Sequence, residues 1–215
     1  MQMKFTAVMV LAVFACGCAF ERVRVTGYLD TGAGRAVPPG ASIHVMENES
    51  PANRLFDREI ALKVERLLEM EGYRLGSPEE SDFVLSYSYG VGGAQTFTES
   101  APLYSGATYA SAEPSGYSYS GWGMGGQVTH VPYTRTVYRK WLVLEVAHGA
   151  AWRQEERKEP VWVGEASSSD SSTDMRERIN YLLAALFEYF GRDTGKQVTV
   201  DVERDDPRVE AVRNF

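Results

Sequence analysis

Residues 175–191, Met-Arg-Glu-Arg-Ile-Asn-Tyr-Leu-Leu-Ala-Ala-Leu-Phe-Glu-Tyr-Phe-Gly, carry the strongest structural signal in the chain. Their apolar side chains recur every three or four positions, which is the period of a helix with one buried face. These side chains are Met175, Ile179, Leu182, Leu183, Leu186, Phe187 and Phe190. Gly191 is expected to end the helix, because glycine adopts the left-handed conformation of helix ends without strain. A helix with such a stripe must pack against another element, so it indicates a layered fold.

A second amphipathic helix is predicted between residues 51 and 71. Its apolar stripe consists of Phe56, Ile60, Val64, Leu67 and Leu68. Ser50 is the expected N-cap, and Pro51 suits the first helical turn, where its missing N–H is not needed. Gly72 is expected to supply the left-handed stop.

Six stretches have the patterns of β-strands, namely residues 21–29, 42–46, 82–89, 133–147, 161–163 and 197–202. Residues 141–144 are apolar on both faces of their strand, which predicts a central position in the sheet. The element order is then β-β-α-β-β-β-α-β. Because both helices need a sheet face to cover, we predict an α+β two-layer sandwich. Its mostly antiparallel sheet would have about five or six strands, with the two amphipathic helices packed on one face.

The first residues have the features of an export signal. Lys4 precedes an apolar run over residues 5–15, which is too short to span a bilayer. The small residues and cysteines that follow resemble the lipobox of bacterial lipoproteins. The resemblance implies a signal peptide over residues 1–17 and acylation of Cys18. Cys16 is the alternative acylation site. The simpler interpretation is an ordinary signal peptide whose two cysteines have no role. The resemblance also implies the outer membrane, because no aspartate stands at the sorting position.

Composition limits what the mature chain can do. Both cysteines lie in the lipobox, so the rest of the chain has no thiol for a disulfide or a thiolate metal site. Removal of residues 1–17 takes away one lysine and no acid, which changes the formal net charge from −7 to −8. Such a chain repels nucleic acid and anionic headgroups on average. We expect one domain over residues 18–202, followed by a loose charged tail over residues 203–215.

Residues 90–132 differ from the rest of the chain. They contain nine of its 20 glycines and only two charged residues. We interpret them as a Gly/Ser/Tyr-rich insertion whose aromatic side chains provide a contact surface. The ligand-binding candidates are Tyr117, Tyr119 and Trp122. The simpler interpretation is a flexible extension of a hairpin between two adjacent strands.

No catalytic or metal-binding pattern stands out in the sequence. The three histidines, His44, His130 and His148, are far apart and lack companion ligands, so we expect no metal and no cofactor. His44 is interpreted as a partly buried structural residue and His148 as a turn residue. Four carboxylates remain as candidates for acid and base groups: Glu145, Glu165, Asp170 and Asp201. They would support hydrolysis only if two of them met in a cleft, about 5–9 Å apart.

Several blocks of sequence resemble a known family. Residues 58–89 contain Ile60-x3-Val64-x2-Leu67-Leu68, then Glu-Gly-Tyr-Arg, then Asp-Phe-Val-Leu-Ser-Tyr. A Gly/Tyr/Trp-rich insertion, a Val/Leu-rich strand, the sequence Val-Trp-Val-Gly-Glu-Ala at 161–166 and a closing amphipathic helix follow. This order is similar to that of bacterial envelope lipoproteins with the domain of unknown function 4136. The resemblance implies a lipobox and brings no catalytic residues.

The expected function is that of a lipid-anchored outer-membrane lipoprotein. It would act as a periplasm-facing binding or scaffolding module without catalysis, held to the membrane by its lipid. Its further partner would be another envelope protein, bound at an exposed strand edge, or a glycan stacked on Tyr117, Tyr119 and Trp122; nucleic acid is not expected. The alternatives are an envelope hydrolase that uses the carboxylates above and a subunit of a larger envelope assembly.

Overall fold

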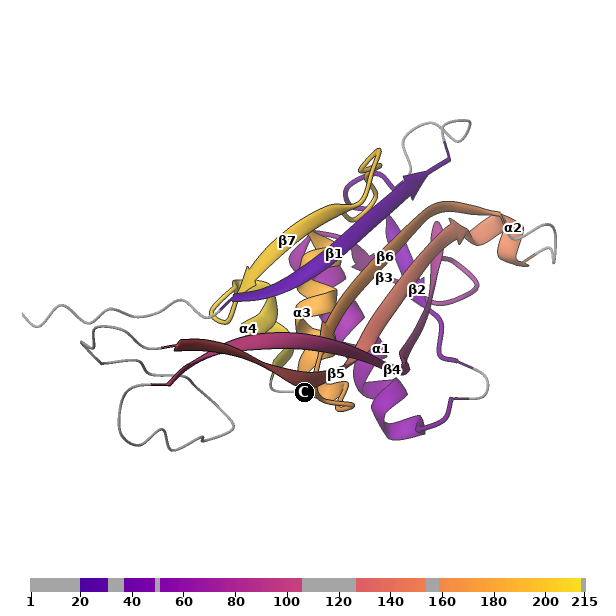
Figure 1. The fold of residues 1–215 in the computed structure, drawn as a ribbon. Coiled ribbons are helices and arrows are strands. Elements are labelled where there is room, and N and C mark those ends of the chain that lie inside the picture. Colours follow the sequence, from indigo (N-terminus) through magenta and orange to yellow (C-terminus); the bar gives the residue numbers. More distant parts are fainter. Residues whose placement is uncertain (1–19, 31–36, 49–50, 106–126, 154–158, 214–215) are drawn as a thin grey trace, which may run out of the picture.

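A computed structural model describes residues 20–30, 37–48, 51–105, 127–153 and 159–213. Within these ranges the chain forms one seven-stranded sheet and four helices (Figure 1). The strands are β1 (Phe20–Leu29), β2 (Ser42–Val45), β3 (Arg74–Leu75), β4 (Phe83–Ser105), β5 (Gln127–His148), β6 (Pro160–Asp170) and β7 (Val198–Glu203). The helices are α1 (Arg54–Met70), α2 (Gly149–Arg153), α3 (Arg176–Phe187) and α4 (Pro207–Arg213). No helix in the described ranges is long and apolar enough to cross a bilayer.

The sheet has the order β3-β2-β4-β5-β6-β1-β7. Four neighbouring pairs are antiparallel, whereas β2 runs parallel to both β3 and β4. The α+β class is therefore confirmed, and β5, which contains residues 141–144, is the central strand as predicted. The sheet is larger than the predicted five or six strands. The additional strand is the two-residue β3, which is too short to produce a pattern in the sequence.

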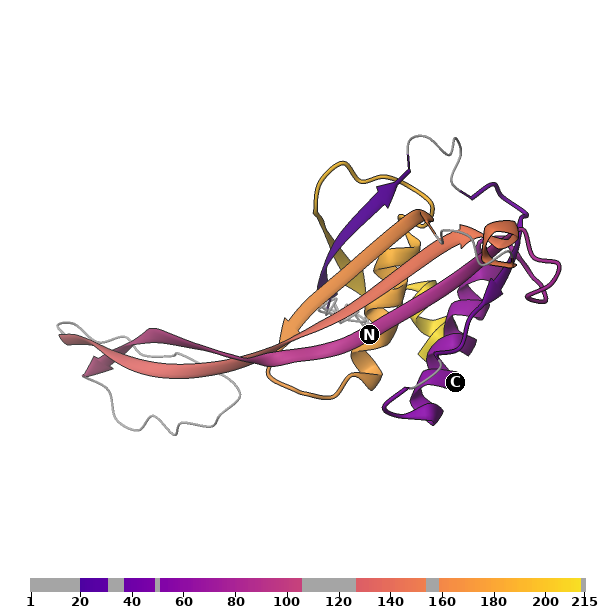
Figure 2. The same cartoon turned by 90° about the vertical axis from the view of Figure 1, so that its right-hand side faces the viewer.

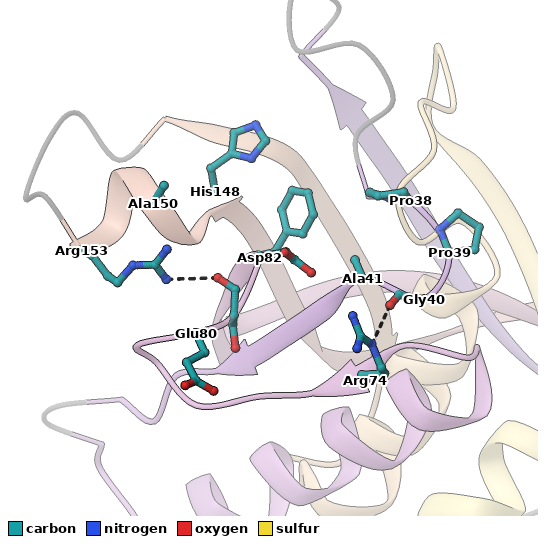
Figure 3. Close-up of a pocket in the computed structure, with 12 residues that line it drawn as sticks. Pro38, Pro39, Gly40, Ala41, Arg74, Glu80, Asp82, His148, Ala150 and Arg153 are labelled. Carbon is teal, nitrogen blue, oxygen red and sulfur yellow. Dashed lines mark hydrogen bonds between the residues drawn. The ribbon is translucent and has the colours of Figure 1, made fainter.

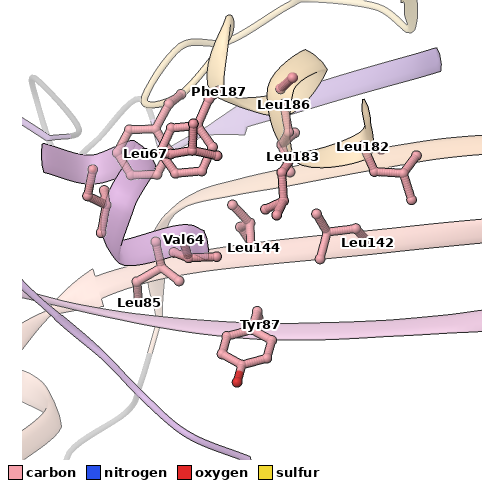
Figure 4. Close-up of a cluster of buried hydrophobic side chains, with 14 of the residues drawn as sticks. Val64, Leu67, Leu85, Tyr87, Leu142, Leu144, Leu182, Leu183, Leu186 and Phe187 are labelled. Atoms are coloured by element: carbon pink, nitrogen blue, oxygen red, sulfur yellow. The ribbon is translucent and has the colours of Figure 1, made fainter. Parts of the chain in front are cut away.

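Helices α1, α3 and α4 lie on one face of the sheet (Figures 1 and 2). Leucines of α3 meet Leu142 and Leu144 of β5 in the core, and Val64 and Leu67 come from α1 (Figure 4). Every residue of α3 from Ile179 to Phe187 is buried. The apolar stripe predicted for this helix is buried throughout, and the neighbouring helices α1 and α4 cover its other sides.

Helix α1 ends just before Gly72 as predicted but begins later than expected, and α3 ends at Phe187, four residues before the predicted stop at Gly191. Gly72 and Gly191 adopt positive φ angles of 84° and 69°. The N-cap of α1 is Asn53, whose side-chain oxygen accepts hydrogen bonds from the N–H groups of Leu55 and Phe56 at 3.1 Å each. Asn53 is as good a cap as a serine. Pro51 therefore lies before the helix, and Ser50 lies outside the described residues.

The prediction of a loose C-terminal tail is wrong for residues 207–213, which form α4. Asp206 begins this helix by accepting a hydrogen bond from the N–H of Arg208 at 2.8 Å. Val209 and Val212 are fully buried. Two apolar residues three positions apart are enough to fasten one short helix to α1 and α3.

Candidate functional site

The residues predicted for lipidation and for aromatic binding lie outside the part of the chain that the structure describes. These are the lipidation candidates Cys18 and Cys16 and the aromatic candidates Tyr117, Tyr119 and Trp122. Lipidation and aromatic binding therefore stay predictions. The first described residue, Phe20, already belongs to β1 and lies only two positions after Cys18.

A loop over the whole of residues 90–132 is the wrong description of this segment. Strand β4 continues to Ser105, β5 begins at Gln127, and the two strands remain paired out to these residues. The described parts of the segment thus agree with the simpler interpretation, a hairpin extension. We call residues 94–105 and 127–138 the arm. Figure 2 shows the arm extending away from the sheet and helices as a twisted two-stranded ribbon.

The arm begins at an irregularity in β4. The register shifts between Val91 and Ala94, where Gly92 and Gly93 lie. Just before it, a Cβ atom on Gly90 would come within 2.8 Å of the Trp141 ring, so only glycine lets this ring lie across β4. Gly90 is therefore required by close packing within a strand, although glycines suggest a loop in the sequence.

Both edges of the arm lack a partner strand within the described ranges. The pairing of β2 with β4 ends at Val45 and Leu85. On the other side, the pairing of β6 with β5 ends at Asp170 and Tyr138. Unpaired strand edges present rows of N–H and C=O groups that are ready to bond with another chain.

The two faces of the arm differ in chemistry, because cross-strand partners lie on the same face. The polar face contains the pairs Thr96–Thr136, Thr98–Thr134, Ser100–Pro132 and Pro102–His130. The apolar face contains Phe97–Arg135, Glu99–Tyr133 and Ala101–Val131. On the apolar face, Phe97, Val131 and Tyr133 are 49%, 44% and 45% exposed. The Tyr133 hydroxyl donates a hydrogen bond to the Glu99 carboxylate.

The four candidate carboxylates do not form an acid–base pair in either of the pockets described below. Asp201 is paired with Arg22 at 3.0 Å on the surface. Glu145 and Glu165 are exposed on the sheet face opposite the helices. Asp170 has a structural environment, because it accepts from Lys140 at 2.6 Å and from Arg178 at 2.7 Å.

Asp170 is held in its charged form by these contacts. Burial alone raises the pKa of Asp170, but hydrogen bonds from Lys140 and the Ser172 N–H, together with the charge of Arg178, outweigh burial and lower it. Arg178 also pairs with Glu21 of β1. The cluster of Lys140, Asp170, Arg178 and Glu21 therefore joins β5, β6, α3 and β1 at the base of the arm.

A pocket of about 590 Å³ lies at the opposite end of β4 and β5, beside α2 (Figure 3). Its guanidinium groups bond to backbone carbonyls: Arg74 to Gly40 at 3.0 Å and Arg153 to Ser81 at 3.1 Å. Hydrogen bonds from the Ser42 N–H and hydroxyl lower the pKa of Asp82, which also lines the pocket. These contacts give Arg74, Arg153 and Asp82 a structural role.

A second pocket of similar volume lies between β2 and α1. It is lined by His44, Glu65 and Trp152, among others. Burial raises the pKa of Glu65, although nearby His44 opposes the change. His44 is half-buried beside the Gly76 carbonyl, 3.1 Å from its Nδ1, in keeping with a structural role. The described residues include no group of three or more His, Cys, Asp or Glu side chains placed to hold a metal ion.

His148 is the last residue of β5 rather than a turn residue. Its ring lies against that of Phe83, with ring centres 5.1 Å apart and ring planes tilted by 31°.

A buried polar cluster at the start of α1 was not predicted from the sequence. The Asp57 side chain is buried and accepts hydrogen bonds from the Tyr87 hydroxyl at 2.9 Å and from Asn48 Nδ2 at 2.5 Å. Burial, with the Asp57 hydrogen bond, raises the pKa of Tyr87 far above its ordinary value, so this hydroxyl remains a donor. Both Tyr87 and Asp57 are buried, and no pattern in the sequence marks Asp57 as the partner of Tyr87.

Comparison with known proteins gives a family match and several structural likenesses. The model of the family described as "Domain of unknown function (DUF4136)" matches residues 34–190. A search of curated proteins found no match.

Three solved structures represent the structural likenesses. A PDZ domain protein from Parabacteroides distasonis is similar at 12% identity and a TM-score of 0.48; the match covers 85% of this chain and only 39% of that protein. The PelC dodecamer from Paraburkholderia phytofirmans is similar at 11% identity and a TM-score of 0.39, with coverage of 80% and 99%. A DUF4136 family protein from Bacteroides thetaiotaomicron is similar at 15% identity and a TM-score of 0.39, with coverage of 77% and 92%.

Proposed function

The chain belongs to the DUF4136 family, and on this premise we propose that it is a lipid-anchored outer-membrane lipoprotein. In this proposal it faces the periplasm and serves as a binding or scaffolding module without catalysis of its own. The observation that carries the proposal is the arm, whose two edges have no partner strand among the described residues and whose apolar face is exposed.

An arm of this kind is expected to be only weakly stable in water without a binding partner. A two-stranded ribbon without a covering layer is marginally stable in water. Here the exposed side chains of Phe97, Val131 and Tyr133 add an unfavourable contact with solvent. A partner that adds a strand or covers the apolar face removes both costs. This favours a role in binding, and it equally suits a subunit of a larger envelope assembly.

In this proposal the acylated Cys18 is only two residues from the first strand of the folded domain. Residues in an extended chain span at most about 3.6 Å each, so Cys18 lies within about 7 Å of the start of β1 at Phe20. Two or more acyl chains on Cys18 would hold the protein firmly, since a single chain binds only marginally. The body would therefore sit against the membrane without a flexible linker.

The test removes the arm and preserves the sheet. Gln95 and Val137 are cross-strand partners, so replacing residues 96–136 with Asn-Gly closes a tight hairpin. We expect the circular dichroism spectrum to keep its helical signal, while in-cell crosslinking to envelope partners is lost. Undiminished crosslinking by the shortened variant would refute the role of the arm.

The predicted acylation is tested separately. Radiolabelled palmitate should be incorporated into the wild-type chain and not into a Cys18→Ser variant. Incorporation into both proteins would show that Cys16 is the acylated residue, and incorporation into neither would refute the lipoprotein assignment.

A further inference from the structure

We infer that the helix-free face of the sheet, at the end where β1 begins, binds an anionic lipid surface together with the apolar face of the arm. This inference rests on the proposed anchoring at Cys18. It identifies a second contact with the membrane, made by the folded chain itself.

The strand register places the arm and the start of β1 at the same end of the sheet. Strands β1 and β6 are antiparallel, and Arg24 is paired with Ser167. The start of β1 at Phe20 therefore lies at the same end of the sheet as the end of β6 at Asp170. Asp170 is paired with Tyr138, where the arm begins. Figure 1 shows β1 starting and the arm leaving the body at this common end. A lipid on Cys18 therefore holds the base of the arm near the bilayer.

The apolar face of the arm also continues the helix-free face of the sheet. Arg24, Ser167 and Trp141 form one row across β1, β6 and β5. The neighbouring row of Val25, Ala166 and Leu142 is buried under the helices, so the first row faces the other way. Side chains two apart on a strand share a face. On this face lie Phe20 and Arg22 of β1 and Arg139, Arg135, Tyr133 and Val131 of β5.

On this face, near the arm, four arginines lie among three acids, whereas the chain as a whole has a net charge of −7. Four exposed arginines lie on it, namely Arg22, Arg24, Arg135 and Arg139. Arg22 is paired with Asp201, but the other three make no ion pair within the described part of the chain. The acids on the same face near the arm are Asp201, Glu203 and Glu99, and Glu99 accepts from Tyr133. Asp205 and Asp206 follow directly after β7 at this end of the sheet. Glu145 and Glu165 lie further along the same face, away from the arm.

The arginines alternate with large exposed apolar side chains. Phe20 is 51% exposed beside Arg22, and Phe97 is the cross-strand partner of Arg135. Guanidinium groups beside aromatic and aliphatic side chains are typical of surfaces that lie at the boundary of headgroups and acyl chains. The backbone edges of the arm, which no other described strand pairs with, disfavour deeper insertion, because hydrocarbon offers them no hydrogen bonds. The arm therefore lies along the surface at headgroup depth.

The experiment uses a soluble chain that begins at Ala19, which retains every described residue and removes the acylation site. It is sedimented with phosphatidylcholine vesicles that do or do not contain phosphatidylglycerol. We expect binding only to the anionic vesicles, with an affinity that decreases as salt is added.

Three variants show whether the named surface is responsible. Each arginine near an anionic surface adds about a factor of five in affinity, so the triple variant Arg24→Glu, Arg135→Glu and Arg139→Glu should bind at least about 100-fold more weakly. The same three positions changed to lysine should retain binding. The matched control carries Arg54→Glu, Arg66→Glu and Arg176→Glu, which make the same change of charge on exposed residues of the helix layer.

Equal binding to neutral and anionic vesicles, or an equal loss in the control, would overturn the inference. Absence of vesicle binding together with capture of duplex DNA by the same arginines would also overturn it, in favour of a nucleic-acid surface. If palmitate labelling failed while vesicle binding remained, only the proposed acylation of Cys18 would be refuted. The two proposals can therefore fail separately.

Discussion

The charge cluster at the base of the arm allows a quantitative prediction. Lys140 is 1% exposed and its ammonium lies 2.6 Å from Asp170, which is 22% exposed. The change Asp170→Asn keeps the size of the side chain and removes its charge. It leaves the Lys140 ammonium buried without a carboxylate, while Arg178 retains Glu21.

We expect this change to lower the free energy of unfolding by about 3 kcal/mol, at the low end of the range for breaking a buried ion pair because Asp170 is not fully buried. For a chain of this size that corresponds to a melting temperature lower by about 6–12 °C. Urea unfolding at neutral pH, followed by circular dichroism and extrapolated linearly, measures the difference.

The control is Asp201→Asn, the same change in an exposed pair. Arg22 and Asp201 lie 3.0 Å apart but are 65% and 48% exposed. Such pairs contribute about 1 kcal/mol or less. Equal losses for Asp170→Asn and Asp201→Asn would show that burial of Lys140 does not matter and would refute the reasoning.

The difference in the free energy of unfolding between the wild type and Asp170→Asn should also depend on pH, and the direction of this dependence follows from the pKa of Asp170. The pKa of Asp170 is lower in the folded protein than in the unfolded chain. Its contribution is therefore complete above the unfolded value, about 3.9, and disappears as the pH falls through the lower folded value. The stability gap between wild type and Asp170→Asn should narrow only in acid below about pH 4, and a constant gap would contradict the pKa direction.

Three further predictions concern packing and buried polar groups. Gly90→Ala should lower the free energy of unfolding by about 1–3 kcal/mol in urea titrations because its Cβ meets the Trp141 ring; Gly93→Ala, with no atom within 4 Å of its Cβ, should cost less. Tyr87→Phe removes a hydrogen bond to the buried Asp57 carboxylate and should cost about 1.5–3 kcal/mol by the same measurement. Val212→Ala should cost about 1–2 kcal/mol and make the amides of α4 exchange hydrogen faster, whereas unchanged exchange would show that Val212 does not hold this helix.

The layered architecture could be predicted from the sequence because the two main helices and the central strand have strong periodic patterns. Ile179 and Leu186 of α3 repeat with the helical period and are fully buried. Elements that depend on few residues could not be predicted. Helix α4 relies on Val209 and Val212 alone, and their surroundings are charged.

The arm was misjudged because its strand pattern is interrupted and its residues are small. Gly92 and Gly93 shift the register, and threonine and serine occupy alternate positions where a core strand would have valine. The arginine surface could not be predicted for a different reason. Arg24 and Arg139 are far apart in the sequence and share a face only through the pairing of β1, β6 and β5.

The position of β1 in the sheet determines when folding can finish. This strand contains the first described residues, yet it lies between β6 and β7 near the end of the chain, and the contact of Arg22 with Asp201 spans 179 positions. Such distant contacts form slowly, because a long loop must close before they contribute. The hairpin of β4 and β5 joins strands that follow each other in the chain and can form without β1. The first strand of the chain therefore cannot pair on either side until β6 or β7 has been made, and both of its edges are satisfied only when both are present.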